Sequence, residues 1–199
     1  SRQLEYAAQQ VRTIEVNGTY YSTFKPATYA KWAAETPDGF VFSLKAIRYS
    51  TNRRVLAEAG ESVAKFLGSG ISELGNKLGP ILWQFAHTKK FDPEDFEGFL
   101  KLLPDNQDGV PLRHALEVRH DSFISPDFVA LARKYGAAIV YAHHDTYPEI
   151  ADVTGGFVYA RLQRGKDDNE RCYADSELNR WAERVKEWAA GGQPDDLPY

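Results

Sequence analysis

The sequence predicts an α/β fold of the TIM-type (β/α)-barrel class, built around a parallel sheet. Short apolar or β-branched runs alternate along the chain with segments of helical periodicity, which is the pattern of repeated strand–helix units. The connections between these segments are short, and no glycine-rich dinucleotide fingerprint follows the first strand. Periodicity alone also fits an open, doubly wound sheet.

Six segments are predicted as strands because they are short, rich in β-branched and aromatic residues, and bounded by turn residues. The first follows a segment of helical character, and the second follows the turn sequence TPDG at residues 36–39. The predicted strands are residues 13–20, 40–46, 81–85, 114–118, 138–142 and 157–162.

The segments between these strands are predicted as helices. Pro26 and Pro93 stand where the first helical turn tolerates proline, and acidic residues after Pro93 complement the helix dipole. The last helix is amphipathic, with Trp181 and Trp188 on its apolar face. The predicted helices are residues 4–10, 26–35, 54–68, 71–77, 93–103, 127–135 and 175–190, with a single turn near 147–150.

Composition narrows the classes of function. The 199 residues carry a net charge of −4, so the chain has no general attraction for nucleic acid or anionic lipid. No long apolar run predicts a membrane span, and the first residues lack the pattern of a secretory signal. The lone Cys172 excludes an internal disulfide. We therefore expect a single cytoplasmic domain over residues 1–199 that does not act at a membrane.

Polar residues occupy positions in the predicted strands where burial alone favours apolar ones. Residues two apart along a strand share a face, and ligands bind at the carboxyl ends of the strands in parallel α/β folds. We therefore expect these residues to form one pocket. They are Glu15, Asn17, Ser43, Lys45, Gln84, Glu117, Arg119, His120, His143, Asp145, Tyr159 and Arg161.

The cations in this set indicate an anion-binding pocket. Lys45, Arg119 and Arg161 would hold a phosphate or carboxylate, which arginine binds through two parallel hydrogen bonds. The expected ligand is a small anionic or sugar-phosphate-like molecule, and the sequence identifies no cofactor. The other predicted ligand-binding residues are Asn17, Gln84 and Tyr159.

Glu15, Glu117 and His120 are the predicted catalytic residues. The two glutamates lie on strands three apart, across the mouth of a narrow barrel, as the paired carboxylates of glycoside hydrolases do. Neighbouring cations would lower both pKa values, which leaves no obvious proton donor. If the pocket is catalytic, a hydrolase or lyase is expected, but the sequence does not establish that a reaction occurs.

A metal centre and a structural ion-pair network are the alternatives for the same residues. Imidazole and carboxylate side chains of this kind can bind a divalent metal. No local spacing such as HExxH supports such a site, and no metal site is predicted. Alternatively, pairs such as Glu15 with Lys45 and Glu117 with Arg161 would hold the top of the barrel together, because buried charges need partners. The candidate metal ligands are Glu117, His120, His143 and Asp145.

A non-catalytic binding module is the alternative function. Basic residues extend the loops after the second and third predicted strands, and Tyr49 lies among them. Aromatic side chains beside a basic groove would suit single-stranded nucleic acid, and the same surface would suit a protein partner. The acidic net charge argues against nucleic acid. The basic residues are Arg48, Arg53, Arg54, Lys89 and Lys90.

The predicted strand ends resemble the YecE-like family of uncharacterised TIM-barrel proteins. Five stretches match in the family's order: residues 14–21 (IEVNGTYY), 40–46 (FVFSLKA), 78–85 (LGPILWQF), 116–120 (LEVRH) and 157–162 (FVYARL). The resemblance implies one strand before Leu4 and one after Tyr199, so we expect the first and last strands to be missing from this chain. The family usually continues with His-Gly where this chain has Gln163-Arg164. The resemblance assigns no activity.

Overall fold

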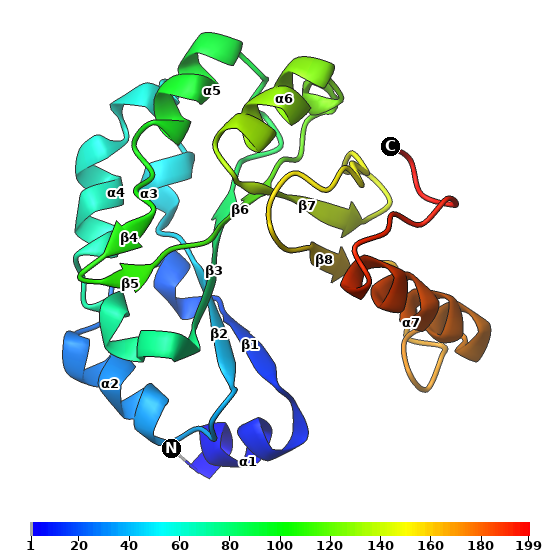
Figure 1. Cartoon of the computed structure of the whole chain (residues 1–199), viewed down its shortest axis with the longest axis horizontal. Helices are drawn as coiled ribbons and strands as arrows, with labels where there is room; N and C mark the ends of the chain where they lie inside the picture. Colours follow the sequence, from blue (N-terminus) through cyan, green and yellow to red (C-terminus); the bar gives the residue numbers. More distant parts are fainter. Residues whose placement is uncertain (1) are drawn as a thin grey trace.

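A parallel sheet of six strands forms the centre of the computed structural model, which describes residues 2–199. The strands pair in the order β1-β2-β3-β6-β7-β8, and the sheet curls into a half-barrel with helices on its outer face (Figure 1). This confirms the α/β class and the six predicted strands in chain order. The strands are β1 Thr13–Val16, β2 Val41–Lys45, β3 Leu78–Gln84, β6 His114–Glu117, β7 Ala138–His143 and β8 Tyr159–Leu162.

Seven α-helices and four short 3-10 helices connect these strands in the described part of the chain. Asp92 and Ser125 cap two of the helices, since their side chains accept hydrogen bonds from backbone N–H groups of the first turn. The α-helices are α1 Arg2–Gln10, α2 Pro26–Ala34, α3 Arg48–Thr51, α4 Gly60–Leu67, α5 Pro93–Leu100, α6 Pro126–Lys134 and α7 Asp175–Ala189. The 3-10 helices are η1 Gly18–Tyr20, η2 Leu56–Glu58, η3 Ile71–Lys77 and η4 Asp121–Phe123. No helix within residues 2–199 has both the length and the apolar character needed to cross a bilayer.

Alternation along the strands gives the sheet two different faces. On the outer face, Trp83 and Leu116 are fully buried in the main apolar core. On the inner face, Leu82, Ala115 and Val140 form a smaller buried cluster of their own. Two residues further along β3 and β6, the inner face becomes polar, and this change positions the candidate site.

The first strand ends at Val16, so the prediction that it continues to residue 20 was wrong. Asn17 leaves the extended conformation, with φ −75° and ψ −23°, and η1 follows. The Thr19 hydroxyl is fully buried and lies within hydrogen-bond distance of two carbonyl oxygens, Val16 at 2.9 Å and Lys45 at 2.7 Å. Thr19 therefore ties the turn to the ends of β1 and β2, which overrides the extended preference of residues 17–20.

Three other predicted elements differ from the structure. The helix predicted over 54–68 begins only at Gly60, because Val55 is extended and η2 intervenes. Residues 71–77 form 3-10 turns interrupted at Gly75, where φ is +53°. No helical turn is present at residues 147–150, and a short hairpin of β4 Asn106–Gln107 and β5 Val110–Pro111 was not predicted.

Gly79 allows β2 and β3 to approach each other closely where their register shifts, between Phe42 and Leu44. A Cβ atom at this position would lie 2.4 Å from Val41 Cγ1 and 2.8 Å from the Phe42 carbonyl oxygen. Because both neighbours belong to a paired strand, they cannot move away without disturbing the sheet. The sheet therefore requires glycine here.

We predict that Gly79→Ala lowers the free energy of unfolding by about 2 kcal/mol, the typical cost of forcing extra volume into a packed site. Urea denaturation of the variant and the wild type measures the difference. Gly156→Ala is the control, because a Cβ atom there meets no other atom within 4 Å. Equal losses in the two variants would contradict the close approach as the cause.

Candidate functional site

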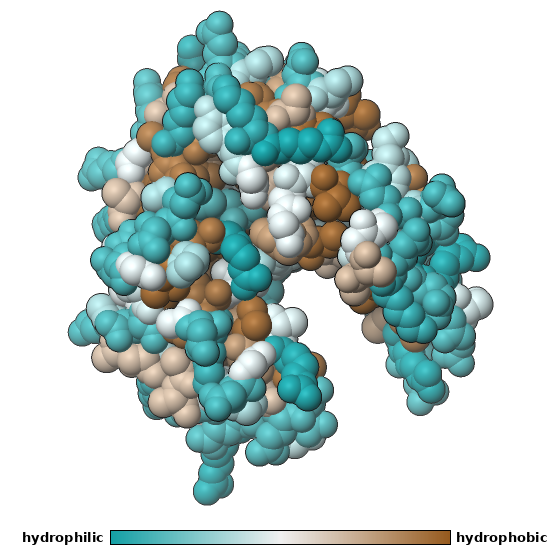
Figure 2. All heavy atoms as spheres, viewed as in Figure 1, coloured by the Kyte–Doolittle hydropathy of each residue, from teal (hydrophilic) through white to brown (hydrophobic). Residues whose placement is uncertain are grey.

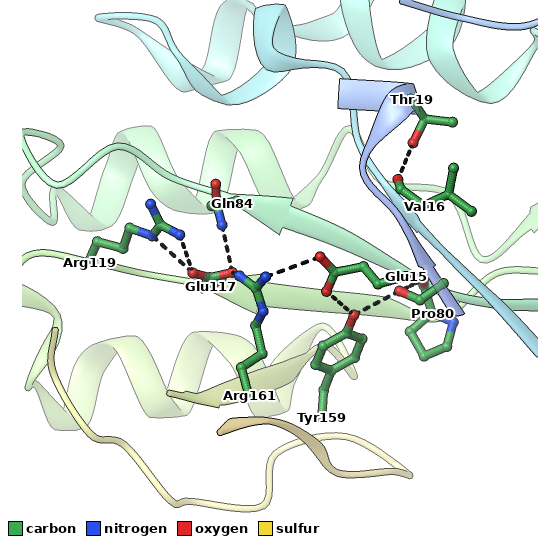
Figure 3. A network of polar contacts seen from close by, with 10 residues as sticks. Glu15, Val16, Thr19, Pro80, Gln84, Glu117, Arg119, Tyr159 and Arg161 are labelled. Atoms are coloured by element: carbon green, nitrogen blue, oxygen red, sulfur yellow. Dashed lines mark hydrogen bonds and ion pairs between the residues drawn. The ribbon is translucent and has the colours of Figure 1, made fainter. Parts of the chain in front are cut away.

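The polar residues of the inner face come from five of the six strands and lie close together at the carboxyl half of the sheet (Figure 3). Strand pairing places Glu15 beside Ser43 and Gln84 beside Glu117. The prediction that strand alternation gathers these side chains is therefore confirmed for most of the set. The residues brought into one hydrogen-bonded network are Glu15, Ser43, Gln84, Glu117, Arg119, Tyr159 and Arg161.

Glu117 is the centre of this network, and its side chain has no exposed surface. One carboxylate oxygen accepts hydrogen bonds from Arg119 Nε at 2.9 Å and Nη2 at 2.7 Å. The other oxygen accepts from Gln84 Nε2 at 2.9 Å and Arg161 Nη1 at 2.5 Å. Four donors satisfy the buried charge, as burial of a carboxylate requires.

Arg161 and Tyr159 join the two edge strands of the sheet, β8 and β1, which do not pair through their backbones. Arg161 Nη2 donates to Glu15 Oε1 at 3.1 Å, and the Tyr159 hydroxyl donates to Glu15 Oε2 at 2.6 Å. Ser43 Oγ lies 2.9 Å from the Tyr159 hydroxyl. Side-chain hydrogen bonds therefore connect β1 and β8 across the inside of the half-barrel, although no backbone hydrogen bonds join these two strands (Figure 3).

The ionisation of the network follows from its partners. Burial raises the pKa of Glu117, but the charges of Arg161 and Arg119 and the Gln84 hydrogen bond outweigh burial and hold this pKa below its usual value. Burial, with the hydrogen bond to Glu15, raises the pKa of Tyr159 above its usual value. At neutral pH these directions leave Glu117 ionised and Tyr159 protonated.

Lys45 lies beside this network but has no carboxylate partner. Its Nζ stands 4.5 Å from the centroid of the Tyr20 ring, and it makes no hydrogen bond or ion pair with any residue in 2–199. Asn52 Nδ2 donates to the Tyr20 hydroxyl at 2.9 Å and fixes the ring in place. Burial lowers the pKa of Lys45, and the Glu117 charge opposes that shift. The predicted pair of Glu15 with Lys45 was wrong, because Arg161 takes that place.

A cavity of about 520 Å³ opens in the gap between β1 and β8. Glu15 and Arg161 reach this cavity, whereas Glu117, Gln84 and Lys45 do not line it. Figure 2 shows the molecule hollowed between the part that carries β1 and the part that carries α7. The cavity lining is Thr13, Glu15, Ser43, Pro80, Val158, Tyr159, Ala160, Arg161, Leu162 and Gln163.

Besides Lys45, two other predicted site residues, Asn17 and His120, do not join the network. Asn17 is exposed, and its side chain makes no capping hydrogen bond to η1. His120 Nδ1 accepts a hydrogen bond from the Ser122 backbone N–H at 3.1 Å and lies 2.9 Å from the Ser122 hydroxyl. His120 therefore caps η4, which accounts for a histidine at this strand end.

The alternative metal centre is not supported. In residues 2–199, no group of three or more His, Cys, Asp or Glu side chains converges to hold a metal ion. His143 lies on the outer face, near the Tyr173 hydroxyl and the Trp181 ring, and Asp145 pairs with Arg164.

Tyr147 was not predicted as a site residue, and its ring centroid lies 4.6 Å from the Arg119 guanidinium. The ring also stacks on His144 at 3.9 Å, so the loop after β7 covers one side of Arg119. An aromatic residue a few positions after a predicted strand end was the one sequence feature that pointed to this contact. Arg119 is therefore held from two sides, by a carboxylate and by an aromatic face.

The fold and site define a class of protein, an α/β half-barrel with an ion-pair network on its inner face. Residues 1–197 match the family described as protein of unknown function DUF72, and the chain belongs to this family. No curated protein matches the sequence.

Two solved structures of DUF72 family proteins share the fold. One, from Enterococcus faecalis V583, is 20% identical with a TM-score of 0.72, and the match covers 93% of this chain and 81% of that one. Another, from Thermotoga maritima MSB8, is 22% identical with a TM-score of 0.67, and the match covers 94% of this chain and 76% of that one.

We predict that Glu117→Gln lowers the free energy of unfolding at pH 7 by about 3–5 kcal/mol, because it removes the buried charge that pairs with the partly buried Arg119 and Arg161. A folded pKa below the usual value means that the stabilisation is present above the usual pKa of 4.5 and is lost as the pH falls through the folded value. The difference in unfolding free energy between the variant and the wild type should therefore become smaller as the pH falls. Urea denaturation across this pH range measures it.

Glu97→Gln is the matched control for this substitution. Hydrogen bonds from Lys134 and Tyr135 lower the pKa of Glu97 to about 2, but this pair lies at the surface. Solvent screens the pair, so its loss should change stability far less. An equal loss of unfolding free energy in the two variants would show that burial is not the reason why Glu117 stabilises the fold.

Proposed function

We propose that the polar inner face at the carboxyl ends of the strands binds a small anionic ligand. The observation that carries the proposal is the half-buried Lys45 ammonium, which has no direct ion-pair partner within residues 2–199 and lies beside an otherwise paired network. Three cations (Lys45, Arg119, Arg161) stand against two carboxylates (Glu15, Glu117), which leaves a net charge of +1. Burying a charge that has no partner costs free energy, because the charge loses its hydration. A bound anion would offset that cost.

The N–H groups of the two arginines that are not used by the glutamates would also bind the anion. Arg119 uses Nε and Nη2 for Glu117, and Arg161 uses Nη1 and Nη2 for the two glutamates, so each guanidinium keeps N–H groups for a ligand. Both arginines are already oriented by their carboxylates. A carboxylate or a sugar phosphate has the acceptor oxygens to use such donors. Gln84 and Tyr159 would contact the same ligand.

For catalysis, we propose hydrolase or lyase chemistry with Glu15 as the carboxylate that moves a proton. Glu15 keeps 19% of its side chain exposed and lines the cavity, whereas both oxygens of Glu117 are occupied by donors. Glu117 would then orient the arginines and leave proton transfer to Glu15. The capping hydrogen bond of His120 supports a structural role for that residue.

We further propose that the chain is a YecE-like member of its family, acts as one cytoplasmic domain, and forms part of a full TIM-type barrel that closes between β1 and β8. The five matching sequence stretches support the family assignment. The partial exposure of Val158 at 36% and Leu162 at 39%, both next to the gap, supports closure at this place. Residue Cys172, alone and exposed, is compatible with a reducing compartment.

A thermal-shift screen of organic acids and sugar phosphates tests the proposal. A ligand at 100 times its Kd should stabilise the protein by about 2.7 kcal/mol, which raises the Tm by about 5–11 °C for a chain of this size. Lys45→Gln should abolish the shift. Lys25→Gln, at an exposed cation directly before α2, should keep it. A shift that survives Lys45→Gln, or no shift with any anion, would contradict the proposal.

A further inference from the structure

A second cavity, of about 570 Å³, lies where the loops after β2 and β3 meet, and it is strongly basic. Its described lining residues include no Asp or Glu. None of its lining residues belongs to the Glu117 network. The cations that line it are Arg53, Arg54, Lys89 and Lys90.

Two of these cations are held in place and two are free. The Arg53 guanidinium donates to the Glu58 carbonyl oxygen, and Lys89 Nζ donates to Asp95 Oδ2 at 2.6 Å and to the Arg54 carbonyl oxygen at 2.8 Å. The side chains of Arg54 and Lys90 are exposed and bond to no residue in the described part of the chain. Because only Lys89 has a carboxylate partner, three positive charges remain without compensation around the cavity.

Thr51 supplies an independent observation at the same place. It lines the cavity and is 1% exposed, and its Oγ1 is buried without a hydrogen-bond partner. Buried hydroxyl groups are normally hydrogen-bonded, so an unpartnered one at a cavity wall requires an explanation. An acceptor atom entering the cavity would provide the missing partner.

We propose that this cavity binds the phosphate group of a small phosphorylated molecule. A terminal phosphate carries close to two negative charges and several acceptor oxygens, which suits three uncompensated cations and a hydroxyl donor better than a carboxylate does. The site is distinct from the anion pocket of the proposed function. It is also adjacent to that pocket, because Asn52 lines the cavity and holds the Tyr20 ring on which Lys45 rests.

Isothermal titration calorimetry of the full chain with inorganic phosphate and with pyrophosphate, at low ionic strength, tests the proposal. The double variant Arg54→Ala/Lys90→Ala should raise the Kd at least tenfold, and its fold should be unaffected because neither side chain has a partner. Thr51→Val should raise the Kd several-fold without lowering the Tm, since the lost hydroxyl bonds to nothing in the free protein.

Lys25→Ala/Arg180→Ala is the matched control, because it removes the same charge from two exposed residues elsewhere. This control should bind phosphate normally. Lys45→Gln should keep the binding event that Arg54→Ala/Lys90→Ala weakens, which separates this site from the proposed function. Absence of binding to the wild type, or equal weakening in the control, would overturn the proposal. A single-stranded oligonucleotide that binds through Arg54 and Lys90 and resists displacement by phosphate would also overturn it, in favour of nucleic-acid binding.

Discussion

The buried ion pair between Glu117 and Arg161 is the constraint on which the inner face of this protein depends. The Glu117 side chain has no exposed surface, so its charge must be compensated by hydrogen-bond donors at both carboxylate oxygens. Arg161 supplies one of them from β8 and also reaches Glu15 on β1, at the opposite edge of the sheet. One guanidinium therefore satisfies the central carboxylate and connects two strands that share no backbone hydrogen bonds.

The same constraint separates the roles of the charged residues. Because Arg119 and Arg161 are both engaged by Glu117, they are oriented but largely neutralised. Lys45 is left as the half-buried cation without a carboxylate, held against Tyr20 beside the network. The site thus combines a rigid, paired centre with one unsatisfied positive charge at its margin.

The alternation of strand and helix segments along the chain was enough to predict the parallel sheet. The alternation of side chains along each strand was enough to gather most of the polar residues on one face, because residues two apart on a strand share a face. Glu117 and Arg161 were paired correctly on this basis, but parity could not show that Glu15 meets Arg161 instead of Lys45, since that choice depends on how the sheet curls. Asn17 was misplaced because the buried Thr19 hydroxyl ends β1 early. The hairpin at residues 106–111 was predictable in principle, since Asp108 and Gly109 form a turn pair with positive φ.

A double-mutant cycle between Glu15 and Arg161 tests most directly whether the network joins the two edges of the sheet. The free energy of unfolding would be measured for the wild type, Glu15→Gln, Arg161→Gln and the double variant. We predict a coupling energy above about 0.5 kcal/mol, because residues in one ion-pair network act together. Additivity within about 0.3 kcal/mol would mean that Glu15 and Arg161 are neighbours without an energetic connection, and the network would not hold the half-barrel together.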